Sequence, residues 1–529
     1  MKRFLRLITL VLCAAMLTGC GVLSAALKGF ELVHYEDMEY TRPDMDAMER
    51  ALETAISASK TEPLTAVMDG VYGFYEEYDW FYTNYALADV RMCHDMTDIY
   101  WEEEYAWCME NTARADAMLE ELYYALADSP IREELEGDAY FGEGFFDSYQ
   151  GESIYDEVFL NLLEREADLT GQYYDLSEQA LAYEYGSEAY YSACADAMAA
   201  LLVELIGLRQ EIARYCGYED YVSFANDFYY YRDYTAAQTE GYLRDIAEYM
   251  VPMYRNLDRE EMLKLADVYS GEMETFAYVK QAAKEMGGLT AEAFSVMESG
   301  GLYDIGYGEN KYAASFEIYL PGYYLPFVFV NPGLTRYDCL TLSHEFGHFC
   351  NDYASYGSYA GVDVMEVFSQ GMEYLMLCYG EDTENLTRVK MADSLCLFVE
   401  QAAFASFEGR MYELTGEELT VEKLYALYDE TAKKFGLDAV GYDKREFVSI
   451  THIYTNPMYI QSYIFSNDAA MQLYGMEQEN PGAGLKLYEE NLASQEMWFL
   501  AFVDQMGLAS PFAEGRVEAL AATFRDVLE

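Results

Sequence analysis

The chain has 529 residues, of which 94 are Asp or Glu and 33 are Lys or Arg, so its formal net charge at pH 7 is −61. This charge repels phosphate backbones and anionic surfaces, which argues against a nucleic-acid partner and favours neutral or basic ligands. The ten cysteines include no Cys-x-x-Cys pair, so the sequence carries no zinc-ribbon signature.

Residues 1–20 are typical of a signal peptide. A basic start at residues 1–6 is followed by an apolar stretch at 7–17 that is too short to span a bilayer. The stretch ends in Leu17-Thr18-Gly19-Cys20, which resembles a bacterial lipobox. We therefore expect export, cleavage before Cys20 and a lipid on its sulfur, which would anchor the protein on a bacterial cell surface or a periplasm-facing membrane. Ordinary secretion without a lipid is the alternative, and residues 21–44 are expected to form a tether.

From residue 45 to residue 300, apolar residues recur at three- and four-residue spacing, which predicts an N-terminal helical region. The whole chain has only ten prolines, so long helices can run uninterrupted. The helices expected in this region span residues 45–59, 64–86, 90–127, 152–168, 176–216 and 236–266.

Residues 313–320 and 324–331 are rich in β-branched and aromatic side chains, with Pro321-Gly322 between them. This pattern predicts a hairpin or a pair of strands. An exposed edge of these strands could hold an extended peptide by main-chain hydrogen bonds. In the alternative reading, the strands only brace the helix that follows.

The sequence His344-Glu345-Phe346-Gly347-His348 comes directly after these strands. Residues i and i+4 of a helix face the same side, so His344 and His348 could bind one zinc ion, each at roughly 2.0–2.1 Å. Glu345 would lie beside them, able to take a proton from a water on the metal. The alternative is a surface helix with two unrelated histidines. The chain has only five histidines and this pair is flanked by apolar residues, which favours the metal site.

A catalytic zinc ion needs a third protein ligand. Residues 361–375 predict a second helix, with Asp363 placed to cap it and residues 351–361 as the connecting loop. Glu366 and Glu373 lie two turns apart on one face of this helix, so either carboxylate could complete the site. A solvated acidic face is the alternative reading in so acidic a chain.

Further helices are expected towards the C-terminus. With the strands and the histidine motif they form a predicted catalytic region, residues 301–529. They span residues 389–412, 420–434, 468–474, 483–502 and 511–528.

The histidine motif, followed by Glu366-Val367 and Ser369-Gln370, resembles the thimet oligopeptidase and oligoendopeptidase F family of zinc peptidases, family M3. The resemblance implies that Glu366 is the third ligand. One departure is that 17 residues separate His348 from Glu366, a shorter gap than we expect for this family, and spacing alone favours Glu373.

The segment from His452 to Tyr463 resembles the part of these enzymes in which a histidine and the tyrosines after it face the substrate. The resemblance implies that His452 and Tyr463, or Tyr459, stabilise the oxyanion formed when a peptide carbonyl is attacked. Asp363 is a further candidate for orienting a ligand.

The resemblance also implies a mainly α fold, in which two helical halves flank a deep substrate channel with a small β-sheet beside the zinc-binding helix. It implies one zinc ion per chain and hydrolysis of internal bonds in short unfolded peptides, with Glu345 as the base. Two other functions stay open. One is a surface lipoprotein that binds peptides without cutting them, and the other is a zinc carboxypeptidase on a related helical scaffold.

Overall fold

The computed structural model describes residues 32–138, 140–149, 157–180, 182–184, 186–358, 360–381 and 383–528. The predicted signal peptide and Cys20 lie outside these residues. The described part of the chain is mainly helical with one small sheet, so the predicted fold class is confirmed.

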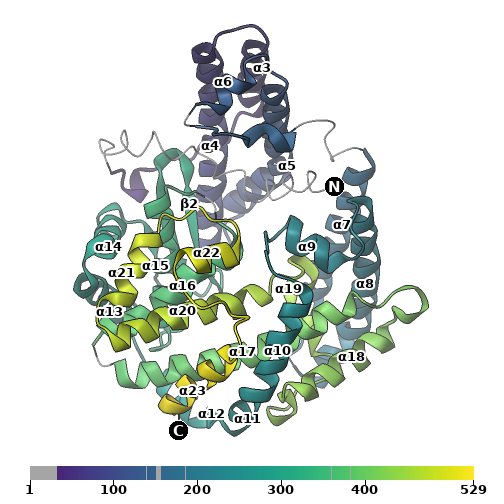
Figure 1. The fold of residues 1–529 in the computed structure, drawn as a ribbon, viewed down its shortest axis with the longest axis vertical. Helices are drawn as coiled ribbons and strands as arrows, with labels where there is room; N and C mark the ends of the chain where they lie inside the picture. Colours follow the sequence, from purple (N-terminus) through teal and green to yellow (C-terminus); the bar gives the residue numbers. More distant parts are fainter. Residues whose placement is uncertain are drawn as a thin grey trace.

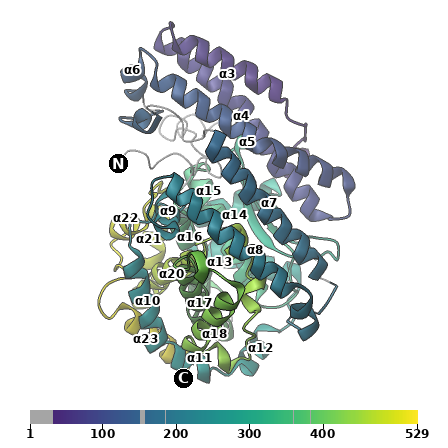
Figure 2. The ribbon, with the colours of Figure 1, turned by 90° about the vertical axis from the view of Figure 1, so that its right-hand side faces the viewer.

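The first three long helices pack against one another and project from the body of the molecule (Figures 1 and 2). They are α3 (Met45–Ser59), α4 (Leu64–His94) and α5 (Ile99–Ala127), followed by the short α6 (Arg132–Glu136). The apolar pattern predicts a break at residues 87–89, but α4 continues through them and the break lies at 95–98. Asp98 determines this boundary, because its side chain accepts a hydrogen bond from the Tyr100 N–H and caps α5.

The middle of the chain continues as helices that pack into the body. These are α7 (Glu157–Ala180), α8 (Glu188–Tyr215), α9 (Tyr221–Phe228), α10 (Ala236–Tyr249), α11 (Val251–Asn256), α12 (Arg259–Ala266), α13 (Glu272–Met286) and α14 (Gly288–Gly300). The single helix predicted at 236–266 is divided in three, because Pro252 lies in the first turn of α11 and Asp258 caps α12. Helix α8 is long and apolar enough to cross a membrane, but 56% of its most apolar window is buried inside the protein, which fits a core helix.

The sheet lies immediately before the histidine motif, as predicted. Strands β2 (Ser315–Leu320) and β3 (Leu325–Val330) form an antiparallel pair, and β1 (Tyr303–Asp304) adds a third, parallel strand that the sequence pattern does not predict. The strand order among the described residues is β1-β3-β2, so within this part of the chain β2 has a free edge. Every residue of β3 is buried, which makes it the strand on which the following helix packs.

The histidine motif lies on α15 (Asp338–Ser355), which packs on β2, β3 and α16 (Val362–Tyr379). Helix α16 also packs extensively against α20 (Gln461–Glu479). The remaining helices are α17 (Thr383–Met411), α18 (Val421–Lys434), α19 (Thr451–Thr455), α21 (Ala483–Asn491), α22 (Phe499–Gln505) and α23 (Arg516–Leu528). The loop predicted at 351–361 is shorter than expected, because α15 continues to Ser355.

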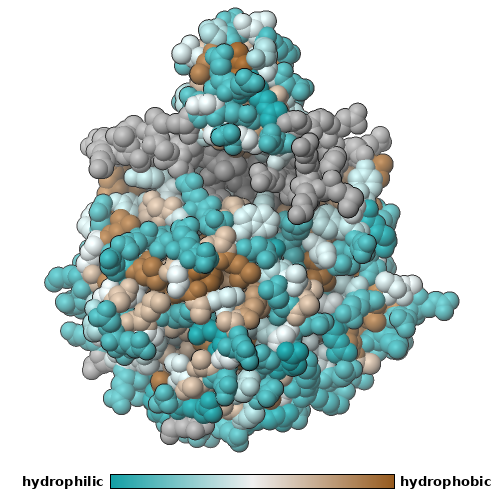
Figure 3. All heavy atoms as spheres, in the orientation of Figure 1, coloured by the Kyte–Doolittle hydropathy of each residue, from teal (hydrophilic) through white to brown (hydrophobic). Residues whose placement is uncertain are grey.

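The buried apolar residues form two cores. A small core joins α3, α4 and α5, and a large one contains residues from Met38 to Phe524. The division of the chain at residues 300 and 301 stays a prediction, and the large core runs across it. Hydrophilic residues cover most of the described surface in view in Figure 3, as the charge of the chain requires.

Candidate active site

The structure brings His344, His348 and Glu366 together. The two imidazole rings lie 5.0 Å apart, and one donor atom from each of the three residues lies within 4.8 Å of the others. Glu366 Oε2 is 3.6 Å from His344 Nε2 and 4.0 Å from His348 Nε2. Two ligands of a tetrahedral zinc ion lie about 3.4 Å apart, so this donor set fits zinc in both its chemistry and its spacing.

Gly347 explains how α16 comes close enough to bring Glu366 opposite the histidines. A Cβ atom at this position would lie 2.6 Å from the Phe368 carbonyl oxygen and 2.6 Å from the Ser369 Cα, both on α16. Such a contact is too short for any side chain, so only glycine allows the two helices this separation. The glycine within the histidine motif is therefore part of the site.

Glu373 lies on the other side of His344. Its Oε1 is 3.0 Å from His344 Nδ1, and its Oε2 is 2.8 Å from the Nζ of Lys390, whose side chain is 2% exposed. Burial opposes the charge on Glu373, but the Lys390 ammonium and His344 outweigh it and hold the pKa of Glu373 below its ordinary value. Glu373 thus orients His344 from outside the three-residue cluster, which contains Glu366.

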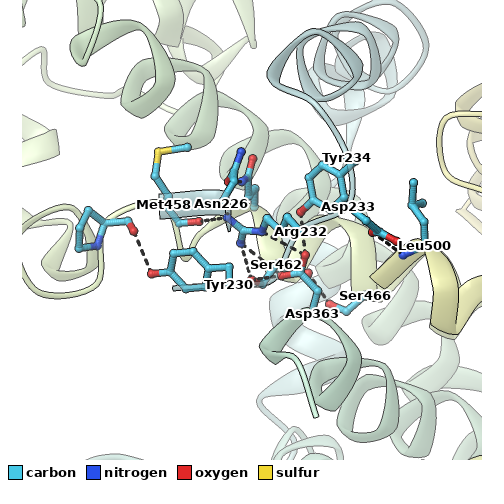
Figure 4. Close-up of polar contacts among 12 residues, drawn as sticks. Asn226, Tyr230, Arg232, Asp233, Tyr234, Asp363, Met458, Ser462, Ser466 and Leu500 are labelled. Atoms are coloured by element: carbon cyan, nitrogen blue, oxygen red, sulfur yellow. Dashed lines mark hydrogen bonds and ion pairs between the residues drawn. The ribbon is translucent and has the colours of Figure 1, made fainter. Parts of the chain in front are cut away.

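Asp363 does not cap α16, and this prediction is wrong. Gly361 is the N-cap residue, and no side chain caps the helix. The Asp363 carboxylate instead binds the guanidinium of Arg232, with Nε–Oδ2 at 3.1 Å, in the network drawn in Figure 4. Asp363 pairs with Arg232 instead of capping the helix, because leaving a buried guanidinium unpaired would cost far more free energy than leaving a helix end uncapped.

Glu345 is 7% exposed and lines the same cavity as the three clustered residues. Burial disfavours its charged form and raises its pKa to about 7, although the neighbouring His344 lowers it and Glu366 raises it further. A carboxylate with a pKa near the working pH is suited to accept and return a proton.

The two histidines differ in charge preference. Burial lowers the pKa of His348 to about 4. Burial also opposes the charge on His344, but its hydrogen bond to Glu373 and the surrounding carboxylates raise its pKa to about 9. His348 is therefore a neutral imidazole at neutral pH, which is the form that binds a metal. The raised pKa of His344 reflects the negative charge of the carboxylates around the site.

Tyr459, Tyr463 and His452 form one aromatic group next to Glu366. The Tyr459 hydroxyl donates to Glu366 Oε1 at 3.0 Å, and the Tyr463 hydroxyl lies 3.4 Å from His452 Nε2. Both tyrosines line the cavity, whereas His452 is not among its lining residues. Burial raises the pKa of Tyr463 and lowers that of His452, so at neutral pH the phenol keeps its proton and the imidazole is uncharged.

The cavity has a volume of about 1080 Å³. One wall comes from α7 and α9, and the facing wall comes from β2, α15 and α16, which lie on the right and the left of the body in Figure 1. Helix α5, one of the projecting helices, contributes Met109. The edge strand β2 contributes Ser315, Phe316 and Glu317. No Lys or Arg is among the described residues that line the cavity, and its carboxylates are Glu166, Glu317, Glu345, Asp352 and Glu366.

Lys390 and Arg232 are supporting residues that the sequence pattern does not indicate. The sequence offers one general hint, which is that basic residues are few, 33 Lys and Arg in 529 residues. Their side chains are 2% and 0% exposed and pair with carboxylates on α16. Nothing in the local pattern separates them from exposed basic residues, so their burial becomes visible only in the fold.

Comparison with known proteins agrees with this architecture. Residues 35–152 match the family model of the peptidase M3 N-terminal domain. A solved structure described as an oligoendopeptidase F is 22% identical with a TM-score of 0.77, over 94% of this chain and 98% of its own. PZ peptidase A, solved with an inhibitor, is 19% identical with a TM-score of 0.77, over 93% and 98%. A structure described as an oligoendopeptidase F from Bacillus anthracis strain Ames is 22% identical with a TM-score of 0.75, over 94% and 98%.

Among curated proteins, none matches the chain. The mainly helical fold of the chain is nevertheless shared with these solved structures over nearly their whole length. Residues 35–152 are thus similar to the M3 peptidase N-terminal domain, and the fold of the whole chain is similar to that of the solved oligoendopeptidase F structures.

Proposed function

We propose that the protein is a zinc-dependent oligopeptidase that hydrolyses internal bonds of short, unfolded peptides. The observation that carries this proposal is the convergence of His344, His348 and Glu366 beside the buried Glu345, on the wall of one cavity. These three residues would hold one zinc ion. When bound, zinc supplies a Lewis acid that polarises the substrate carbonyl and makes water more acidic.

The residues of the chain supply the proton transfers. Glu345 takes a proton from the attacking water on its carboxylate and delivers it to the amide nitrogen that leaves. The Tyr463 hydroxyl, on the cavity wall, donates to the oxygen that gains negative charge, and His452 behind it keeps that hydroxyl oriented. Tyr459 donates to Glu366 and holds that carboxylate in place.

The free edge of β2 supports binding of an extended peptide, because its unpaired N–H and C=O groups can pair with a peptide main chain beside Glu345. The lining favours internal cuts over carboxypeptidase action. A carboxypeptidase has to bind the terminal carboxylate, and none of the described lining residues is a Lys or Arg that could do so.

Replacing Glu345 by Gln tests the mechanism. The variant should still bind one zinc ion per chain by metal analysis, because its ligands are intact, and should lose peptide cleavage by about 10²–10⁴-fold because the base is gone. Wild-type protein with and without a chelator, incubated with a mixed peptide pool and read by mass spectrometry, is the control. Full cleavage by the variant, or cleavage that resists the chelator, would contradict the proposal. Loss of single C-terminal residues would indicate a carboxypeptidase, and intact peptides retained on the protein would indicate a binding protein.

We also propose that the protein is exported and held on a bacterial membrane by a lipid on Cys20, on the basis of the lipobox-like sequence alone. Expressed in bacteria fed a labelled fatty acid, the full chain should take up the label, and a Cys20→Ala variant should not. Equal labelling of the two would contradict the anchor.

A further inference from the structure

The loop between α9 and α10 holds a charged side chain in the interior of the protein (Figure 4). The side chain of Arg232 is 0% exposed, and that of its partner Asp363 is 2% exposed. The next residue, Asp233, accepts hydrogen bonds from the N–H groups of Leu500 and Ala501 at 2.8 and 3.0 Å, which fixes the loop against α22. A guanidinium buried this deeply is tolerated only where its donors are satisfied.

All five N–H donors of Arg232 have an acceptor. Nε and Nη2 bind the two oxygens of Asp363 at 3.1 and 3.2 Å, and Nη2 also donates to Ser462 Oγ at 2.9 Å. Nη1 donates to Asn226 Oδ1 at 3.0 Å and to the Met458 carbonyl at 2.8 Å. One side chain therefore joins α9, the first turn of α16 and the segment that carries Tyr459 and Tyr463.

On α16, Asp363 precedes Glu366 by one turn. Its carboxylate also accepts from the hydroxyls of Tyr234, at 2.7 Å, and Ser462. These contacts of the Asp363 carboxylate hold the first turn of α16 to the α9–α10 loop and to α20. The position of Glu366, one turn further along α16, therefore depends on Asp363.

In the tyrosine segment, Met458 has a φ of 69°, a left-handed conformation that is unusual for a side-chain-bearing residue. Its N–H donates to Glu408 Oε1 at 2.7 Å, and its carbonyl accepts from Arg232. The backbone is thus held on both sides of this residue. The next side chain, Tyr459, donates to Glu366 at 3.0 Å.

We infer that Arg232 is a positioning residue for the active site, which holds α16 and the Met458–Tyr459 backbone in the register that joins Tyr459 to Glu366. The inference rests on the proposed function, since it assigns a role to Glu366 and Tyr459. Arg232 itself is not among the residues that line the cavity, so its effect has to act through these two residues.

Arg232→Lys tests the inference, because lysine keeps the charge and loses the fork that reaches five acceptors. We expect kcat to fall by about 10–100-fold with little change in KM, and the dissociation constant for zinc, measured by chelator competition, to rise by about tenfold. Arg516→Lys is the matched control. Arg516 binds Asp468, whose side chain is 1% exposed and which lies on the same helix as Tyr463, and neither residue is among those that line the cavity. It should lower thermal stability and leave kcat and zinc affinity unchanged.

A double-mutant cycle with Tyr459→Phe tests whether Arg232 affects kcat through Tyr459. If Arg232 acts through Tyr459, then Arg232→Lys should lower kcat by less than about threefold in the Tyr459→Phe background. Fully multiplicative losses, or an Arg232→Lys variant that behaves like Arg516→Lys, would overturn the inference.

Should Arg232→Lys fail to fold, Ser462→Ala removes one acceptor and leaves the ion pair. It should lower kcat by about threefold, and an unchanged kcat would overturn the inference. A wild-type protein that cleaves no peptide would refute the proposed function instead.

Discussion

His344 depends on a carboxylate that does not belong to the three-residue cluster. Glu373 accepts from its Nδ1 and is itself held by the buried Lys390. Glu373→Gln keeps the shape of the side chain but removes the charge that fixes the ring. We expect zinc affinity, measured by chelator competition, to fall by about 10–100-fold. We also expect thermal stability to fall, because Lys390 would be left as an unpaired buried charge.

The double variant Glu373→Gln/Lys390→Met separates these two effects. Removing both charges should restore much of the thermal stability, because no unpaired ion remains, while zinc affinity stays low. If Glu373→Gln bound zinc as tightly as the wild type, the orienting role would be refuted.

The same residue shows how far single positions could be predicted. The sequence places Glu366 and Glu373 on one face of a helix, and spacing alone favours Glu373, whereas the structure brings Glu366 to the histidines. The choice depends on how α16 lies against α15, which the close approach at Gly347 fixes. His344, His348 and Glu345 were predictable, because their geometry is set within one helix. The roles of Lys390 and Arg232 were not, because each depends on a partner carried by a different element, Glu373 and Asp363 on α16.

The contact between α15 and α16 is the feature on which the cluster depends most directly. Gly347→Ala would place a Cβ atom 2.6 Å from backbone atoms of Phe368 and Ser369. Backbone cannot turn aside as a side chain can, so the two helices have to separate and carry Glu366 away from the histidines. We expect a loss of about 1–3 kcal/mol in the free energy of unfolding, as for overpacked cores, and weaker zinc binding in the protein that still folds.

Gly207→Ala on α8 is the matched control, because nothing lies within 4 Å of the Cβ atom it would add. Removing a glycine from an open helical position should stabilise the protein by about 0.4–1 kcal/mol and leave zinc affinity unchanged. Equal zinc affinity in Gly347→Ala and the wild type would show that the site tolerates a wider helix separation. Thermal melts and chelator competition on the same samples give both quantities.

The helices and the hairpin could be predicted where the signal is local. Helix α3 begins and ends at the predicted residues, since Asp44 caps it by accepting from the Asp46 and Ala47 N–H groups. Strand β1 could not be predicted, because its two residues pair with β3 only once the chain has folded back. The helix predicted at 483–502 is two helices, α21 and α22. An apolar period alone does not mark the turn between them.

The charge of the whole molecule continues into its cavity, where five carboxyl groups line the wall and no Lys or Arg is found among the described lining residues. Burial raises the pKa of Glu317, Glu345 and Asp352, which reduces the negative charge that these three carry at neutral pH. Peptides with Lys or Arg around the cut bond should still be cleaved with a higher kcat/KM than matched peptides with Glu, by about tenfold or more at low salt. The advantage should shrink as the salt concentration rises, because the Debye length falls from about 30 Å at 0.01 M to about 3 Å at 1 M. The measurement is kcat/KM for peptide pairs that differ only in charge, across this salt range. A charge preference that salt does not change would mean that one short contact, and not the field of the molecule, selects the substrate. Equal kcat/KM for both peptides would mean that charge plays no part in selection.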